Sequence, residues 1–396
     1  MPSTPSRIFS TEDARRLAKR RLPRLVFDFI EGAAGREVGL ARNELRFDEI
    51  CLQPRVMADV SERSLATELL GRNFDVPFGM APMGMCNLVC RDADRLLAEA
   101  ATRIGMPLCI SSAASTSMEE IYGFAGKNAW FQLYFRQSEA QSLAVTERAH
   151  EAGYETLVLT VDVPQVSRRI RDQRNGFNWP FHMTPRAFFD FATHPRWSLS
   201  TLASGIPRPR NFGGGDGGFD RRASRAGADW NFLTKLRDKW AGRLIVKGVT
   251  SAEDAVRVRD AGADAIYVSN HGARQLDSAP AAIDLLPLIR QAVGPKLPLL
   301  FDSGIRNGED VVKALALGAD FVMIGRPALF ALAAEGRPGL NALLQCFVED
   351  MDIAMAQLGA NSIKDIGPQV LFDCAEGRNG GMNTARPAKL QIAAKT

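Results

Sequence analysis

The chain has 396 residues, of which 46% are hydrophobic and 24% charged, and this ordinary balance excludes an intrinsically disordered protein. Its net charge of +4 is too small to indicate nucleic-acid binding, and no segment approaches the roughly 18 apolar residues of a membrane-spanning helix. The six cysteines lack metal-ligand spacing and the N-terminus lacks an apolar leader, so we expect a cytoplasmic protein with reduced thiols and no metal site.

Residues 1–76 are expected to form a helical cap that precedes the main fold. Two amphipathic segments predict helices over about 10–20 and 23–34. The remainder of the cap is expected to be irregular, apart from a helix-like ATELL segment at 66–70.

From residue 77 onward, short apolar runs alternate with helix-length amphipathic segments. The eight runs are 77–81, 107–111, 129–134, 156–161, 243–247, 264–269, 297–301 and 320–324. Such runs are typical of parallel strands that are buried on both faces, and eight βα units predict an α/β fold, a closed (β/α)8 TIM barrel over 77–375. The polar stretch 376–396 is expected to be a poorly ordered tail.

Residues 163–229 interrupt this spacing after the fourth strand and predict a long mobile insertion. They include eleven arginines, no lysine and five aspartates, a net charge of +6, together with nine aromatic residues. Three interpretations are open: a surface loop, a segment that binds nucleic acid, or a segment that lies on an anionic membrane. The aromatic and basic residues of 176–222 favour the membrane, which would place the protein peripherally on its inner face.

A TIM barrel carries its active site where the strands end, so the residues at these positions are candidates. In strand order they are Pro82, Met83 and Gly84; Ser111; Gln132 and Tyr134; Thr160 and Asp162; Lys247; Ser269 and His271; Asp302, Ser303, Gly304 and Arg306; Gly325 and Arg326. The glycines and arginines after the last two strands predict a phosphate site. No GxGxxG motif follows a strand, which points to a mononucleotide or a phosphorylated substrate rather than a dinucleotide.

Lys247 ends a buried strand, where its charge needs an anionic ligand or an internal salt bridge. His271 is the one histidine of four that follows a strand, and it can take a proton near neutral pH. Arg274 and Arg169 can clamp a carboxylate, while Asp162 can orient His271. A base, a carboxylate clamp and a neighbouring cofactor together predict the oxidation of a hydroxy acid.

At these positions the sequence resembles the FMN-dependent L-2-hydroxy acid oxidoreductases. The stretch SNHGARQLD at 269–277 is similar to the active-site signature of that family. Further similar stretches are RLPRLVFDF (21–29), FQLY (131–134), TVD (160–162), VKG (246–248), DSGIRNG (302–308), KALALGAD (313–320) and IGRP (324–327). The resemblance covers most of residues 10–365 and implies an FMN cofactor and a homotetramer.

The resemblance also implies the role of each residue. His271 would be the catalytic base with Asp162 as its partner, and Tyr134, Arg169 and Arg274 would bind the substrate. The flavin would be held by Pro82, Met83, Gly84, Ser111, Gln132, Thr160, Lys247, Ser269, Asp302, Ser303, Gly304, Arg306, Gly325 and Arg326.

Some positions depart from the family pattern. Phe29 stands where the family usually has a tyrosine whose hydroxyl helps to bind the substrate carboxylate. Ala113 stands where glycolate oxidases carry a tryptophan, so a wider pocket and a larger or aromatic substrate side chain are expected. Gly84 and the stretch 193–199 are similar to the dehydrogenases of the family, which favours a quinone-type electron acceptor over oxygen.

Three hypotheses follow. The chain oxidises an L-2-hydroxy acid to the 2-oxo acid, with hydride and carbanion routes both open and with a quinone or oxygen as acceptor. Alternatively, it binds flavin but has altered or lost activity because of Phe29. A phosphosugar isomerase on the same barrel is the third hypothesis, although it would not need His271 and Arg274 beside Lys247.

Overall fold

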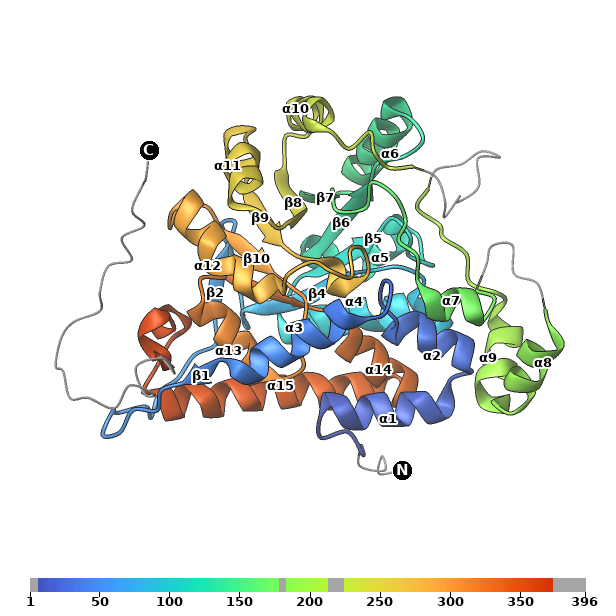
Figure 1. The fold of residues 1–396 in the computed structure, drawn as a ribbon, viewed down its shortest axis with the longest axis horizontal. Coiled ribbons are helices and arrows are strands. Elements are labelled where there is room, and N and C mark those ends of the chain that lie inside the picture. The colour runs from blue at the N-terminus through green and yellow to red at the C-terminus, as the bar shows by residue number, and fades with distance from the viewer. Residues whose placement is uncertain (1–5, 178–182, 213–223, 373–396) are drawn as a thin grey trace.

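The computed structural model describes residues 6–177, 183–212 and 224–372. Eight parallel strands close into a barrel in the order β10-β11-β4-β5-β6-β7-β8-β9 (Figure 1). The strands are β4 (Phe78–Met83), β5 (Leu108–Ser111), β6 (Ala129–Tyr134), β7 (Thr156–Thr160), β8 (Arg243–Val249), β9 (Ala265–Val268), β10 (Leu299–Phe301) and β11 (Phe321–Ile324). The predicted (β/α)8 barrel is confirmed, and each strand overlaps one of the eight apolar runs.

Helices surround the barrel and connect its strands. They are α4 (Ala93–Ile104), α5 (Met118–Ala125), α6 (Glu139–Glu151), α10 (Trp230–Lys239), α11 (Ala252–Asp260), α12 (Ala282–Val293), α13 (Gly308–Ala316), α14 (Arg326–Glu335) and α15 (Arg337–Leu358). The core has two layers, because successive strand residues point to opposite faces. Residues such as Trp130 and Tyr267 fill the barrel interior, while the neighbouring strand residues pack against the helices.

The N-terminal cap contains the helices α1 (Thr11–Arg21), α2 (Arg24–Glu31) and α3 (Val38–Glu49). Helix α1 packs against α14, and α3 packs against α12. The expectation of an irregular chain over 38–49 was wrong. The apolar residues of α3 are sparse, and the helix is instead held by polar contacts to the barrel, among them Arg46 with Asp284 at 2.8 Å.

The expected helix at 66–70 was also wrong. These residues form β2 (Thr67–Leu69), which pairs antiparallel with β3 (Arg72–Phe74). Leu70 and Gly71 have φ values of 54° and 75°, so a tight hairpin turn ends the segment before a helix can form. Leu69 and Phe74 then pack with the barrel-interior residues, and the ring of Phe74 lies 5.6 Å from that of Phe321.

The described part of the insertion contains α7 (Ile170–Arg174), α8 (Pro185–Ala192) and α9 (Pro195–Ser204). Helices α8 and α9 pack against each other and stand at the edge of the molecule (Figure 1). At the other end of the chain, β12 (Leu371–Phe372) pairs with β1 (Cys51–Leu52). The predicted tail at 376–396 and parts of 176–222 lie outside the described residues, within which no helix is long and apolar enough to cross a membrane.

Candidate functional site

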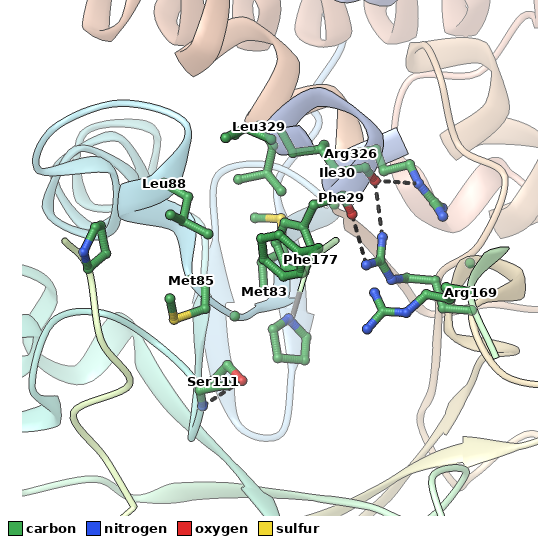
Figure 2. Close-up of a pocket in the computed structure, with 18 of the residues that line it drawn as sticks. Phe29, Ile30, Met83, Met85, Leu88, Ser111, Arg169, Phe177, Arg326 and Leu329 are labelled. Carbon is green, nitrogen blue, oxygen red and sulfur yellow. Dashed lines mark hydrogen bonds between the residues drawn. The ribbon is translucent and has the colours of Figure 1, made fainter. Parts of the chain in front are cut away.

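A cavity of about 680 Å³ lies at the carboxyl ends of the barrel strands, a size typical of ligand pockets. Sixteen of the twenty predicted site residues line it, from every barrel strand except β7 and from α2 and the insertion. The other four, Gln132, Thr160, Asp162 and Ser269, do not line it but bind residues that do, either directly or, for Thr160, through Gln132. Figure 2 shows Arg169 and Arg326 on one side of the cavity and Met83, Met85 and Leu88 on the other.

His271 lies between an acid and a phenol. Its Nδ1 is 3.1 Å from a carboxylate oxygen of Asp162, and its Nε2 is 3.3 Å from the hydroxyl of Tyr134. Because a carboxylate only accepts hydrogen bonds, Nδ1 carries the proton in neutral His271 and Nε2 keeps a lone pair. Burial raises the pKa of Asp162, but the charges of His271 and Lys247 outweigh this effect and hold the pKa below its ordinary value. The pair can therefore accept a proton at Nε2 while Asp162 stays ionised.

Two glycines allow the close approaches around this pair. Gly248 follows Lys247 with a φ of 103°, and a Cβ there would collide with Asp162. Gly272 has a φ of 61°, and a Cβ there would collide with the guanidinium of Arg326. His271 itself has a φ of 59°, a strained value for a non-glycine residue and one that recurs at functional sites.

Lys247 is buried and bonds inside a polar network. Its Nζ donates to the hydroxyl of Ser269 at 2.7 Å and lies 3.4 Å from a carboxylate oxygen of Asp302. The Ser269 hydroxyl in turn donates to Asp302 and accepts from the backbone N–H of His271. Burial lowers the pKa of Lys247, but Asp302 and Asp162 outweigh it, so the pKa lies above its ordinary value and the amine is cationic. The internal salt bridge exists, and the lysine also lines the cavity.

A second buried chain of hydrogen bonds crosses β5, β6 and β7. The hydroxyl of Ser111 donates to the side-chain carbonyl of Gln132 at 2.8 Å, and the Gln132 amide donates to the hydroxyl of Thr160 at 3.0 Å. Gln132 is fully buried, so these bonds fix its orientation. The three side chains form a continuous polar layer behind the cavity wall.

The loops after β10 and β11 bring charge and backbone together. Arg306 pairs with Glu44 at 2.5 Å, whereas Arg326 bonds the backbone carbonyls of Ile30 and Gly32 in the described chain. Burial, helped by the charge of Arg306, lowers the pKa of Arg326 to about 10, so Arg326 stays cationic at neutral pH. Gly325 caps the N-terminus of α14 without a side-chain hydrogen bond, which leaves backbone donors at the cavity. These groups suit a phosphate.

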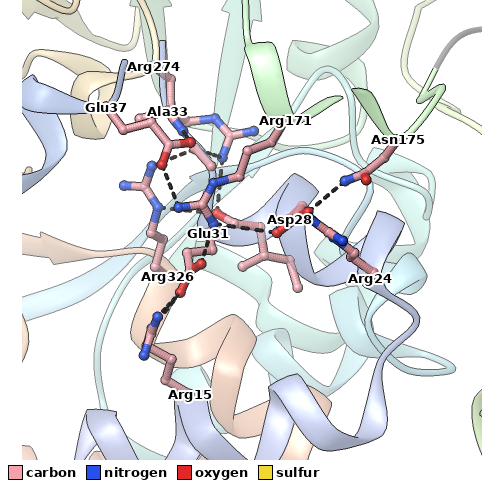
Figure 3. Close-up of polar contacts among 12 residues, drawn as sticks. Arg15, Arg24, Asp28, Glu31, Ala33, Glu37, Arg171, Asn175, Arg274 and Arg326 are labelled. Atoms are coloured by element: carbon pink, nitrogen blue, oxygen red, sulfur yellow. Dashed lines mark hydrogen bonds and ion pairs between the residues drawn. The ribbon is translucent and has the colours of Figure 1, made fainter. Parts of the chain in front are cut away.

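Arg274 and Arg326 share the C-terminal end of α2. Arg274 donates to the carbonyls of Phe29, Ile30 and Gly32 at 2.9 to 3.1 Å, beside the bonds from Arg326. The last carbonyls of a helix have no partner within it, so two guanidiniums satisfy them here. Figure 3 shows both arginines converging on this helix end.

The insertion is tied to the cap by a charged cluster (Figure 3). Arg171 of α7 pairs with Asp28, Glu31 and Glu37, and Asn175 donates to Asp28 at 2.6 Å. These contacts place the start of the insertion over α2, next to the cavity.

Apolar side chains form the rest of the wall. The ring of Phe29 stacks on that of Phe177 at a centroid distance of 4.6 Å, and the guanidiniums of Arg169 and Arg274 lie 5.8 and 5.4 Å from the Phe29 ring. Helices α8 and α9 contribute Phe188, Phe191, Ala192, Trp197, Ser198, Thr201 and Leu202 to the lining. The side chain of Trp197 anchors α9, because its indole N–H donates to the carbonyl of Leu88 at 2.7 Å.

Several residues that shape the site were missed by the sequence analysis. Asn43 and Asn270 are buried and exchange two side-chain hydrogen bonds, at 2.8 and 2.9 Å. Asp277 accepts from the backbone N–H groups of Arg36 and Gly39, which docks α3 on the loop after β9. Asp277 ends the SNHGARQLD stretch, so its place in the motif was a usable signal, whereas nothing in the local pattern around Asn43 distinguishes it.

Comparison with known proteins shows which family the chain belongs to. Residues 18–373 match the FMN-dependent dehydrogenase family. (S)-Mandelate dehydrogenase of Pseudomonas putida is 38% identical over 387 residues, which cover 96% of each chain. L-lactate dehydrogenase of Caulobacter sp. (strain K31) is 38% identical over 376 residues, which cover 92% of this chain and 98% of the relative.

The similar solved structures belong to the same kind of protein. The monotopic membrane protein (S)-mandelate dehydrogenase superposes with a TM-score of 0.88 at 38% identity, over 93% of this chain and 100% of the other. A mandelate oxidase with (S)-2-phenylpropionate gives a TM-score of 0.79 at 35% identity, over 92% of this chain and 98% of the other.

Proposed function

Because the chain belongs to the FMN-dependent dehydrogenase family of 2-hydroxy acid oxidoreductases, we propose that it oxidises an L-2-hydroxy acid with a large or aromatic side chain and passes the electrons to a quinone. The observation that carries this proposal is the grouping of His271, Asp162, Arg169 and Arg274 around one cavity with Lys247. A base and a carboxylate clamp beside a flavin site are what this reaction requires.

The cavity fits FMN. Arg306 and Arg326, with the backbone at Gly304 and Gly325, would hold the phosphate at the N-terminus of α14. Lys247 offers a buried positive charge, and Ser111 with Gln132 and Thr160 offers a polar layer for the ring system. Pro82, Met83, Gly84, Ser269, Asp302 and Ser303 complete the proposed set. When bound, FMN supplies the two-electron acceptor that no side chain of the protein provides.

The substrate carboxylate would be bound by Arg169 and Arg274, whose guanidiniums both lie at the ring of Phe29. Planar guanidiniums bind carboxylates with two parallel hydrogen bonds, so this pair fixes orientation as well as charge. Tyr134 would contact the same substrate through its hydroxyl, which burial keeps protonated by raising its pKa.

The proton would go to Nε2 of His271. The Nδ1–H of the ring donates to ionised Asp162, which holds the ring in position and stabilises its protonated form. The proton leaves the hydroxyl oxygen in the hydride route and the Cα carbon in the carbanion route, and the same nitrogen receives it in both.

The substrate side chain would meet the apolar wall. Phe29, Phe177, Met85 and Leu88 line the cavity, so a larger apolar or aromatic group buries more surface there than the hydrogen of glycolate does. The relatives include both an (S)-mandelate and an L-lactate dehydrogenase, and the apolar wall favours a substrate of the mandelate type.

Helices α8 and α9 would lie on a membrane. Their exposed apolar residues are Phe188, Phe189, Leu199 and Leu202, flanked by Met183 and Ile206, with exposed fractions from 57% to 79%. Arg186, Arg196, Arg208 and Arg210 are exposed around them, and this combination suits an anionic bilayer surface. The similar (S)-mandelate dehydrogenase is a monotopic membrane protein, and the inner face of the membrane is the proposed location for this chain.

The same patch opens into the cavity, because Met183, Phe188, Leu202 and Ile206 also line it. A lipid-soluble quinone could then reach the flavin site from the bilayer, which supports a quinone rather than oxygen as the acceptor. We also propose a homo-oligomer, a tetramer by family resemblance, which sedimentation of the purified protein tests.

Anaerobic mixing with glycolate, L-lactate and (S)-mandelate tests the proposed reaction. Bleaching of the flavin absorbance is expected with all three acids and fastest with mandelate. A yellow protein that no 2-hydroxy acid bleaches would instead support the alternative in which Phe29 has abolished the activity. Reoxidation by a water-soluble quinone should then exceed reoxidation by oxygen, and the reverse order would identify an oxidase.

A further inference from the structure

Arg225 is a buried cation in the cavity that the proposed reaction leaves without a role. It lies near the end of the insertion, shortly before α10, and only 9% of its surface is exposed. Its backbone N–H donates to the carbonyl of Pro164 at 2.9 Å, so the end of the insertion is fastened to its start. Arg225 lines the same cavity as Tyr134 and His271.

The Arg225 guanidinium contacts the ring of Tyr134. The guanidinium carbon lies 5.0 Å from the ring centroid, within the distance of a cation–π interaction. The Tyr134 ring also stacks near the His271 ring, with centroids 6.5 Å apart and planes 21° apart, while its hydroxyl is 3.3 Å from Nε2. The cation and the proposed base therefore contact the same phenol.

The ring of Tyr134 needs neighbours to hold it. The second side-chain torsion of tyrosine has a broad energy minimum, so an unsupported ring can rotate away from its position. Arg225 is buried, so its attraction for the ring is less weakened by water than at an exposed site. Burial and Asp162 raise the pKa of Tyr134, and Lys247, Arg225 and Arg274 offset part of this, so the hydroxyl remains a donor at neutral pH.

We propose that Arg225 is a positioning residue that holds the Tyr134 ring so that its hydroxyl stays against Nε2 of His271 and the substrate. The proposal rests on the proposed function, because Tyr134 acquires its importance from the substrate. It does not require Arg225 to lack other partners, since the contact with the ring is enough.

Arg257 provides a matched control. Its guanidinium carbon lies 3.9 Å from the centroid of the Trp230 ring, so it makes a cation–π contact of the same kind. Neither Arg257 nor Trp230 lines the cavity, and Trp230 has no hydroxyl. Arg257→Gln therefore removes a cation–π contact that lies away from the proposed site.

The first readout is the limiting rate of flavin reduction by (S)-mandelate in anaerobic single-turnover experiments on the FMN-loaded protein. Arg225→Gln should slow the rate about 3- to 30-fold, the equivalent of roughly 0.6 to 2 kcal/mol for a cation–π contact at 1.36 kcal/mol per tenfold. Arg225→Lys should restore part of the rate, and Arg257→Gln should stay within about twofold of wild type.

The second readout is a double-mutant cycle with Tyr134→Phe, which keeps the ring and removes the hydroxyl. If Arg225 acts through that hydroxyl, Arg225→Gln should have little further effect in the Tyr134→Phe background. Equal, additive effects in both backgrounds would overturn the proposal. Loss of rate in Tyr134→Phe with no loss in Arg225→Gln would overturn it as well, while leaving the proposed function intact.

The third readout needs no activity. The chain has four tyrosines, so 3-fluorotyrosine labelling gives four ¹⁹F resonances, and Tyr134→Phe identifies one of them. Arg225→Gln should shift or broaden the Tyr134 resonance, and Arg257→Gln should not. An unchanged Tyr134 resonance in Arg225→Gln would contradict the positioning role of Arg225, whether or not the protein is active. Failure of every hydroxy acid to reduce the flavin would instead refute the proposed function.

Discussion

The two walls of the cavity are built on opposite principles. On the strand-end wall, basic side chains lie beside acidic ones: Lys247 beside Asp302, His271 beside Asp162 and Arg306 beside Glu44. The helical wall, made by α2, α8 and α9, is apolar, and Leu202 is 79% exposed. An unpaired charge is costly to bury. An exposed apolar patch such as the one on α8 and α9, by contrast, is favoured when another surface covers it.

The two walls therefore suit different tasks: the strand-end wall suits the proposed chemistry, and the helical wall suits docking on a membrane. Strand ends are held by the barrel register on both sides, so they can keep a base, an acid and a lysine at fixed distances. The helices of the insertion are joined to the barrel by a few contacts, such as the bond from Trp197 to Leu88 and the pairs made by Arg171. In the proposed function, the first wall would carry out the reaction, and the second would contact the substrate side chain and the membrane.

His271→Ala should have the largest effect, because it removes the base from the strand-end wall. We expect flavin reduction to fall by about 10² to 10⁴, or roughly 3 to 5 kcal/mol of barrier, with FMN still bound. Stopped-flow absorbance measures the rate. His150→Ala is the control, since His150 packs on Trp240 at 5.9 Å and does not line the cavity. A His271→Ala variant that reduces at the wild-type rate would exclude His271 as the base.

Asp94 tests, outside the cavity, the rule that a buried charge needs a partner. It is 1% exposed and accepts the backbone N–H groups of Ser115 and Thr116, but within the described chain it has no salt bridge. Burial raises its pKa to about 6, above the ~3.9 of an unfolded chain, so the folded protein binds the proton more tightly. Wild type therefore loses stability as the pH rises from about 4 to about 6.

Asp94→Asn lacks this titration. Relative to wild type, its free energy of unfolding should improve by about 2 kcal/mol between pH 4.5 and pH 7, because part of the effect of the two-unit shift is already present at pH 4.5. Denaturant titrations of the FMN-loaded proteins at both pH values measure the difference. A difference that does not change with pH would show that Asp94 has a partner that compensates its charge.

Phe29→Tyr alters the point where the two walls meet, beside Arg169 and Arg274. A hydroxyl that reaches the substrate carboxylate should tighten binding by about 1 kcal/mol. The gain in kcat/KM should be larger for glycolate and lactate than for mandelate, because the small acids have less apolar binding to the wall. Phe27→Tyr is the control, since Phe27 packs on Phe330 away from the cavity. Lower kcat/KM for all three acids would mean that Phe29 is adapted to a different substrate.

The residues of the strand-end wall could be predicted from the sequence, because each one directly follows its own strand in the chain. Once eight parallel strands are recognised, each residue after a strand falls on the same rim, which is why Lys247, His271 and Asp302 gather around one cavity. The bonds between them could not be predicted, since the path from Lys247 through Ser269 to Asp302 depends on the distances between neighbouring strands.

The helical wall could not be predicted in the same way. The stacking of Phe29 on Phe177 joins segments far apart in the sequence, and no periodicity relates them. Arg274 shows most clearly how far the sequence could predict contacts. Its place in the motif predicted a carboxylate clamp, but not its bonds to the carbonyls at the end of α2.

Replacing most of 176–222 with a short Gly/Ser linker tests the separation of the two walls most directly. Flavin reduction by a 2-hydroxy acid and turnover with a soluble acceptor should persist, because the base, the clamp and the lysine all lie outside the segment. Binding to anionic vesicles should fall, and the wild-type binding should weaken as salt screens the arginines. Equal vesicle binding by both proteins, or loss of flavin reduction in the shortened one, would contradict the assignment of chemistry and membrane docking to different walls.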